Sequence, residues 1–145
     1  LTQGVQKHIE SAQSNGTIRS LKGRKCRFDL WEPDTFEMSK AMPYEEAVNH
    51  YGPTTRLKRA YTYKAVNRLI QASAADMTKK AMVDIYESGT TPLLQVHDEL
   101  AFSVESVEQA KELAEMMENA LPLAVPNKCD IEMGANWGEF SEVKR

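Results

Sequence analysis

Three residues with chemically active side chains, His97, Asp98 and Glu99, interrupt the apolar stretch TPLLQVHDELAFSV. On a strand, adjacent side chains point to opposite faces, but at a tight turn Asp98 and Glu99 can approach one site. Carboxylate oxygens suit Mg²⁺, which keeps coordination positions open for substrate phosphates. A carboxylate at a hairpin tip therefore fits one half of a two-metal phosphoryl-transfer site. Taken alone, such residues at a turn are more often simply solvated, and His97 is more often a hydrogen-bonded bystander.

Two amide side chains, Asn67 and Gln71, lie four residues apart in a segment with helical periodicity. This spacing puts both amides on one face of a helix. Amides donate and accept hydrogen bonds, and every base pair presents acceptors in the minor groove, at purine N3 or pyrimidine O2. Donors one helical turn apart could check pairing geometry there without reading the sequence. A solvated polar helix face is the simpler alternative.

Basic residues crowd the segment TIRSLKGRKCRF, where two strand-like runs flank a turn at Lys22 and Gly23. They are Arg19, Lys22, Arg24, Lys25 and Arg27. Such a hairpin could clamp a nucleic-acid backbone, and a solvated ribbon explains the charges equally well. Residues 1–80 carry 14 Lys and Arg against 8 Asp and Glu, whereas residues 81–145 carry 4 against 13. The net charge of −3 therefore combines a basic and an acidic half, which ordinary surface charge also explains.

The helices that would position these groups follow from apolar residues at helical spacing. We expect helices over 4–14, 58–87 and 107–120, with Arg59 and Lys64 in the first part of the second. The third opens on the capping box Ser106-x-x-Gln109. The stripe expected to be buried in the long helix is Val66, Leu69, Ile70, Ser73, Ala74, Met77, Ala81 and Ile85.

The remaining segments predict strands and one excursion. We expect a hairpin over 17–28, a buried hairpin around His97 and a last strand within KCDIEMGANW. Residues 31–57 hold three prolines and mixed charge and resemble a surface insertion, with a short helix in YEEAVNHYG. Paired strands with helices between them indicate an α+β fold: an antiparallel sheet of hairpins packed against a long helix and a second helix.

Length and composition narrow the class of protein. The 145 residues, of which 41% are hydrophobic, suit one compact domain. We expect no membrane span, because no apolar run approaches the necessary length. Cys26 and Cys129 lie far apart without a CxxC pattern, so two thiols are the simpler interpretation and one disulfide is the alternative.

Three segments, YKAVNRLIQASAAD, QVHDEL and GANW, occur in an order and spacing that resemble the carboxyl-terminal end of family A DNA polymerases, the bacterial DNA polymerase I superfamily. The resemblance covers essentially the whole chain, and RAYTYKAVNRLIQ is most similar to phage-type members. It implies a palm subdomain over 1–145 and location in the cytoplasm, that of the bacterial host if a phage encodes it. Ala72 departs from the glycine usual in the family. Tyr63 stands where bacterial relatives have arginine, with Lys64 beside it.

The resemblance also implies roles for individual residues. Asp98 would bind Mg²⁺ with Glu99 in support, and His97 would lie by the primer terminus. Asn67 and Gln71 would contact the minor-groove edge of primer–template DNA. Lys64, Arg59 and Arg24 are further expected DNA contacts. The reaction would be attack of the primer 3′-hydroxyl on the α-phosphate of a deoxynucleoside triphosphate (dNTP).

Parts of the family pattern lie outside this sequence: the first metal motif, resembling DYSQIELR, the fingers helix that holds the triphosphate, and the thumb. Because the chain begins at Leu1 rather than methionine, we expect it to be a fragment or one piece of a split polymerase, inactive alone. Two alternatives stay open. The chain could be a stand-alone remnant that binds DNA without chemistry, or a by-product that self-associates through exposed apolar surface.

Overall fold

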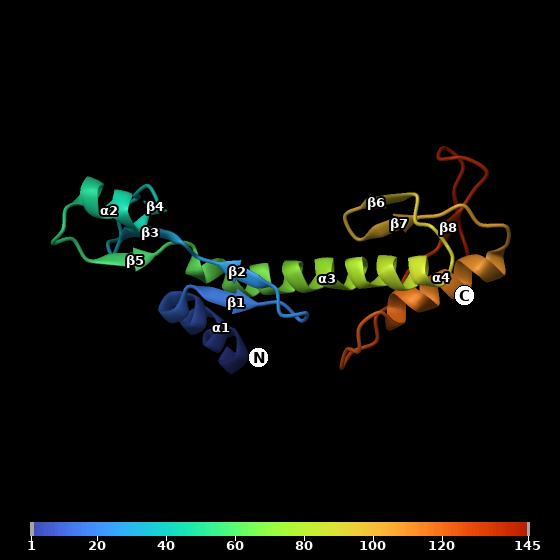
Figure 1. The fold of residues 1–145 in the computed structure, drawn as a ribbon, viewed down its shortest axis with the longest axis horizontal. Coiled ribbons are helices and arrows are strands. Elements are labelled where there is room, and N and C mark those ends of the chain that lie inside the picture. The colour runs from blue at the N-terminus through green and yellow to red at the C-terminus, as the bar shows by residue number, and fades with distance from the viewer. Residues whose placement is uncertain (1, 145) are drawn as a thin grey trace. The chain divides into compact units, whose positions relative to one another are not determined.

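The computed structural model describes residues 2–144, which combine helices with short antiparallel strands and so confirm the α+β class. The strands lie in four small sheets, ordered β1–β2, β4–β3–β5, β6–β7 and β8–β9. The chain divides into two compact units, residues 1–73 and 74–145 (Figure 1). No helix within residues 2–144 combines the length and apolar character needed to cross a membrane.

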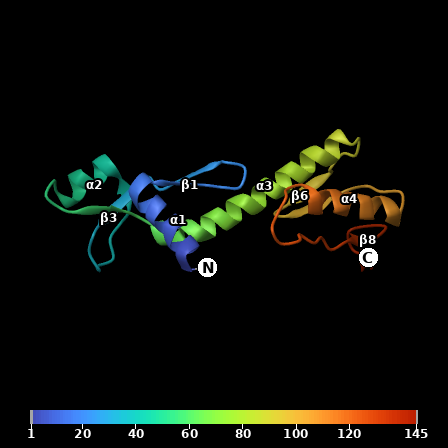
Figure 2. The ribbon, with the colours of Figure 1, turned by 90° about the horizontal axis from the view of Figure 1, so that it is seen from below.

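The first unit opens with the predicted helix and hairpin, both confirmed. Helix α1 covers Thr2–Asn15, and strands β1, Thr17–Arg19, and β2, Lys25–Arg27, pair in antiparallel register. Gly16 joins helix to strand at a φ of 67°, a left-handed conformation that glycine adopts without strain. In Figures 1 and 2, α1 lies against β1. The buried core between these elements and α3 is Ala12, Ile18, Phe28 and Ala65, with Ile9, Cys26 and Leu69 packed against it.

The segment predicted as an insertion folds as a small sheet with one helix. Its elements are β3 (Leu30–Pro33), β4 (Met42–Pro43), α2 (Tyr44–Tyr51) and β5 (Leu57–Arg59). Helix α2 confirms the short helix expected in YEEAVNHYG. Strand β3 is central and pairs antiparallel with both neighbours. The loop between β3 and β4 exposes Phe36 and Met38 completely. Whether the segment is an insertion stays a prediction.

The long helix, α3, begins at Ala65 and ends at Glu87, so the predicted start at residue 58 was wrong. Residues 57–59 instead form β5, and a 3₁₀ turn, η1, covers Thr62–Lys64. Tyr61 separates them at a φ of 61°. The reason for the error is that the apolar stripe begins only near residue 65, whereas residues 57–59 find ladder partners on β3.

The buried face of α3 also differs from the predicted stripe. Ser73, Ala81 and Ile85 are buried as expected, but Ile70 is 60% exposed and Ala74 is exposed as well. In the first unit, the face occupied by Ala65 and Leu69 packs on the core. Ile70 follows Leu69 directly and therefore turns about 100° away from that face.

The second unit holds the predicted hairpin, helix and terminal strand. They are β6 (Leu94–Val96), β7 (Glu99–Ala101), α4 (Val107–Asn119) and β8 (Glu132–Met133), which pairs with β9 (Ser141–Glu142). Ser106 caps α4, with its hydroxyl accepting a bond from the Gln109 N–H at 3.1 Å, so the capping box is confirmed. The β6–β7 hairpin was expected to be buried and is not: Leu93, Leu94 and Val96 are 65%, 47% and 46% exposed, because no described element covers them.

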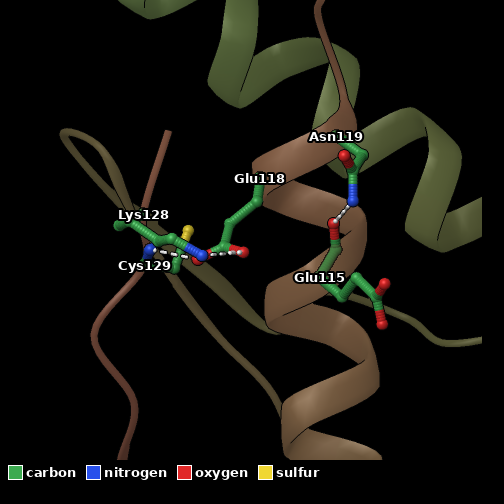
Figure 3. A network of polar contacts seen from close by, with 5 residues as sticks. All are labelled: Glu115, Glu118, Asn119, Lys128 and Cys129. Carbon is green, nitrogen blue, oxygen red and sulfur yellow. Dashed lines mark hydrogen bonds and ion pairs between the residues drawn. The ribbon is translucent and has the colours of Figure 1, made fainter. Parts of the chain in front are cut away.

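Glu118 connects the end of α4 to the segment that leads into β8 (Figure 3). Its carboxylate accepts a hydrogen bond from the Cys129 backbone N–H at 2.8 Å and lies 3.7 Å from the Lys128 ammonium group. Glu118 is mostly shielded from solvent, whereas Lys128 is largely exposed. Within residues 2–144, neither Cys26 nor Cys129 forms a disulfide.

Candidate catalytic and DNA-binding residues

His97 and Asp98 form a two-residue turn between β6 and β7, closed by the pair Val96 and Glu99. Hairpins with two-residue turns need positive φ in the turn, and His97 supplies it at 56°. The Gln95 side chain donates a hydrogen bond to the His97 carbonyl oxygen at 3.0 Å and so braces the turn. All three residues of the HDE sequence are exposed. Sequence reasoning missed Gln95, whose only signal was a polar residue within an apolar strand.

The chemistry of this turn suits a hard divalent cation. Asp98 and Glu99 supply carboxylate oxygens from adjacent positions, and one or two carboxylates are what Mg²⁺ usually takes from a protein. Within residues 2–144, no group of three or more His, Cys, Asp and Glu side chains gathers closely enough to hold a metal ion alone. The residues present therefore fit a shared site, with further ligands from substrate or another polypeptide segment.

Asn67 and Gln71 both lie in the first half of α3 and are exposed. Their spacing of four residues keeps them on one face. Neither amide makes a hydrogen bond to any residue within 2–144, so their donors and acceptors are available to a ligand. The amides belong to the first unit and the acidic turn to the second. That they serve one site stays a prediction.

Arg59, a predicted DNA contact, is in contact with the protein itself. It lies on β5 and not on the long helix, which corrects the expected position. Its Nη1 donates to the Phe28 carbonyl oxygen at 3.0 Å, and its guanidinium carbon lies 4.5 Å from the centroid of a Trp31 ring. A side chain added at Gly16 would come within 2.6 Å of this guanidinium. These contacts give Arg59 a structural role.

Lys64 is exposed and is the last residue of η1, so it precedes α3 and does not lie in the long helix as predicted. Its ammonium group lies 5.1 Å from the ring centroid of Tyr61 and 5.6 Å from that of Tyr63. Cation–π attraction at exposed sites is worth about 0.5–1 kcal/mol. Lys64 therefore keeps its charge accessible while two aromatic rings restrict its position.

The basic hairpin β1–β2 is fixed to α3 by two hydrogen bonds near its turn. Arg24 donates to the Ala72 carbonyl oxygen at 2.9 Å, and the Leu21 N–H donates to the Ser73 hydroxyl at 3.2 Å. Arg68 adds a third link, because its Nη1 donates to the Arg27 carbonyl oxygen at 3.0 Å. Sequence reasoning missed these roles of Ser73 and Arg68, since main-chain partners leave no pattern in the sequence.

The face of this hairpin that points away from the core carries three cationic side chains. Ile18 and Cys26 pair across the strands and point toward the core, so Arg19, Lys25 and Arg27 point the other way. Arg19 lies directly opposite Lys25, a like-charge pair that is destabilising unless an anion lies nearby. None of these three cations makes an ion pair with a residue in the described part of the chain. The face is therefore suited to phosphate groups.

Comparisons with known proteins agree with this set of features. Residues 2–139 match the family described as DNA polymerase family A, so the chain belongs to that family. It is 39% identical over 127 residues to a DNA-directed DNA polymerase of Pseudomonas phage M6 and 32% identical over 141 residues to the thermostable DNA polymerase I of Thermus thermophilus. These alignments cover 88% and 92% of this chain but only 16% and 14% of those relatives.

A solved structure supports the same assignment. The chain is similar to the POL domain of Pol1 from M. smegmatis in complex with a DNA primer–template and dNTP, with a TM-score of 0.55 and 30% sequence identity. The similarity covers 86% of this chain and 20% of that one.

Proposed function

We propose that this chain is the carboxyl-terminal palm portion of a DNA-directed DNA polymerase. In this proposal it supplies one metal-binding carboxylate and part of the primer–template contact surface. The observation that carries the proposal is the exposed carboxylate of Asp98 at a braced two-residue turn, in a chain that belongs to DNA polymerase family A.

The role proposed for the acidic turn follows from its donors. Asp98, with Glu99 beside it, would hold a Mg²⁺ ion. When bound, this ion makes the primer 3′-hydroxyl easier to deprotonate and neutralises charge that develops on the pyrophosphate. The exposed imidazole of His97 is proposed to lie against the primer terminus, where a ring nitrogen can donate a hydrogen bond to the terminal nucleotide.

The first unit is proposed to hold the primer–template duplex. Asn67 and Gln71 would donate hydrogen bonds to the minor-groove acceptors that all base pairs share, so the contact tests pairing geometry rather than sequence. The cationic face of β1–β2, together with Lys64, would bind backbone phosphates. Arg24 contributes chiefly by holding this hairpin against α3. Phosphate contacts fix the position of the protein on the duplex, whereas minor-groove contacts depend on the geometry of the base pair.

The rest of the polymerase is proposed to complete the site. A two-metal mechanism needs a second set of ligands beside Asp98, and dNTP binding needs the fingers. Three apolar residues of the β6–β7 hairpin are exposed: Leu93, Leu94 and Val96. Their exposure supports the proposal that another segment of the polymerase, outside residues 1–145, covers them. Alone, the chain is expected to be inactive and to self-associate through this apolar surface.

Primer extension by the complete polymerase tests the proposal. We expect Asp98→Asn, which keeps the shape but removes the charge, to lower the extension rate by at least about a hundredfold, since a metal ion supplies several kcal/mol of transition-state stabilisation. Asp130→Asn is the matched control, because Asp130 is an exposed aspartate of the same unit. Equal extension rates for the two variants would contradict the role of Asp98.

A second candidate function is DNA binding without chemistry, favoured by the unneutralised cations of the β1–β2 face. Under this alternative, duplex DNA binds the chain tightly and no upstream polymerase segment restores extension. Extension restored by adding that segment would exclude the alternative.

A further inference from the structure

The loop between β3 and β4 presents two apolar side chains to solvent and is held by hydrogen bonds at both ends. Phe36 and Met38 are completely exposed, and we call them the apolar tip. At one end, the Asp34 N–H donates to the carbonyl oxygen of the residue that precedes β5, at 2.9 Å. At the other, the Tyr51 hydroxyl donates to the Lys40 carbonyl oxygen at 2.8 Å and accepts from the Lys40 N–H at 3.0 Å. These bonds restrict the tip and so lower the entropy cost of inserting it into a partner.

The same small sheet contains an open apolar hollow of about 330 Å³. Helix α2 packs against β3 beside it (Figure 1). The hollow is lined by residues of β3, α2, β5 and the loop before β5: Trp31, Tyr44, Val48, Pro53, Thr55 and Leu57. Two rings of its wall, Trp31 and Tyr44, meet edge to face with centroids 5.1 Å apart. Ligand pockets occupy about 300–1,000 Å³, so this hollow lies at the lower limit and suits one large side chain.

We propose that the apolar tip of one copy of this chain inserts into the hollow of a second copy. The tip does not fill the hollow of its own chain, because Phe36 and Met38 do not line it and are completely exposed. Both surfaces are apolar and both lie in residues 30–59, so every copy carries one of each. A contact between two unlike surfaces of the same chain is heterologous and needs no other molecule. The inference is independent of the proposed polymerase function.

The charges beside the two surfaces are opposite in sign. Glu37 lies between the two tip residues, is exposed, and makes no ion pair in the described part of the chain. Residues 52–59, which supply half of the lining, carry three cations and no acidic residue. Among them, Arg56 lies between the lining residues Thr55 and Leu57, and its side chain is 89% exposed. Insertion would therefore bring Glu37 toward cations, whereas the phosphates of a nucleic acid would repel it.

The size of the contact predicts a weak association. A buried phenylalanine covers about 150–250 Å². With Met38 and the walls of the hollow, one contact buries roughly 600–800 Å² in total, below the value of about 1,200 Å² at which stable interfaces begin. We therefore expect a dissociation constant on the order of 100 μM and association that rises with protein concentration.

Two variants separate the two parts of the contact. Phe36→Ser removes the tip and leaves the hollow, whereas Val48→Trp fills the hollow and leaves the tip. Association is measured by sedimentation velocity over a range of protein concentrations. All variants are made in a Leu94→Ser background, because the exposed β6–β7 surface is itself expected to self-associate. Leu21→Ser is the matched control, since Leu21 is 60% exposed in the β1–β2 turn of the same unit.

We expect Phe36→Ser and Val48→Trp each to weaken association at least about tenfold and Leu21→Ser to leave it unchanged. An equimolar mixture of the first two holds one intact tip and one intact hollow. Association should therefore return in the mixture and stop at a pair of one copy of each. Unchanged association in Phe36→Ser, or a mixture that behaves as the sum of its components, would overturn the inference.

A cross-linking measurement gives a result that does not depend on filling the hollow. The photoreactive residue benzoylphenylalanine replaces Phe36 in isotope-labelled chains, which are mixed with unlabelled chains, irradiated and analysed by mass spectrometry. We expect cross-links between labelled and unlabelled chains that join position 36 to Tyr44, Val48 or Leu57. Cross-links confined to one chain, or to residues outside the hollow, would contradict the inference. Neither DNA nor metal is present, so the outcome is independent of the Asp98 test.

Discussion

Replacement of Arg59 by alanine tests whether this side chain stabilises the first unit or is held ready for DNA. Arg59 connects the β4–β3–β5 sheet to the core through the Phe28 carbonyl oxygen and Trp31. Its guanidinium also lies against Gly16, so it contacts three separate segments of the unit. We expect the substitution to destabilise the unit even in the absence of DNA.

The magnitude follows from opposing contributions. The hydrogen bond of 3.0 Å from the guanidinium to a carbonyl oxygen is charge-assisted and worth about 1.5–3 kcal/mol. The stacking on Trp31 at 4.5 Å adds about 0.5–2 kcal/mol. Against these, Nε of Arg59 is buried without a hydrogen-bond partner in the described residues, which costs about 1–3 kcal/mol. The favourable contributions are larger, so Arg59→Ala should lower the free energy of unfolding by about 1.5 kcal/mol.

Urea unfolding followed by Trp31 fluorescence measures this change, in a Trp137→Phe background so that one tryptophan remains. Arg59→Lys keeps the charge but loses the planar stacking, and should fall between alanine and the original. Arg56→Ala is the control, because Arg56 pairs with Asp34 at 3.3 Å while 89% exposed and should change stability by less than about 0.5 kcal/mol. Equal stability of the Arg59→Ala and Arg56→Ala variants would refute the structural role.

Two further predictions follow from the described contacts. Ser106→Ala removes the hydroxyl that caps α4 and should cost about 1 kcal/mol in thermal unfolding followed by circular dichroism, whereas Ser106→Gly should cost only a few tenths; equal costs would contradict the capping role. Lys25→Gln should reduce the slope of log affinity for duplex DNA against log salt concentration by about one. Arg68→Gln should leave this slope unchanged, because the Arg68 guanidinium contacts Arg27 and Phe28. The opposite result would refute the distinction between cations that bind phosphate and cations that stabilise the fold.

Elements marked by local side-chain patterns could be predicted from the sequence. The α1 helix, the β1–β2 hairpin with glycine in its turn and the Ser106 cap each depend on residues within a few positions of one another. The start of α3 could not be predicted in the same way. Residues 57–59 precede a helix in the sequence, but they pair with strand β3, which lies far from them along the chain. This long-range strand pairing, and not the local helical periodicity, determined the conformation of residues 57–59.

The site shows the same division between local and distant information. The turn carrying Asp98 and the face carrying Asn67 and Gln71 were predicted from spacing, and the structure exposes both. Ile70 was assigned to the wrong face because apolar character alone does not distinguish a buried position from an exposed one.

The basic residues of the first unit make the limit of sequence reasoning clearest. Arg59, Arg24 and Arg68 donate to main-chain carbonyl oxygens 31, 48 and 41 residues away in sequence. Every residue carries a carbonyl group, so no side-chain pattern distinguishes an arginine used in this way from a basic residue such as Lys25, which makes no such bond in the described residues. Net charge therefore overstates the surface available to phosphates. The cations proposed to bind DNA are therefore those that make no hydrogen bond to a distant part of the folded chain.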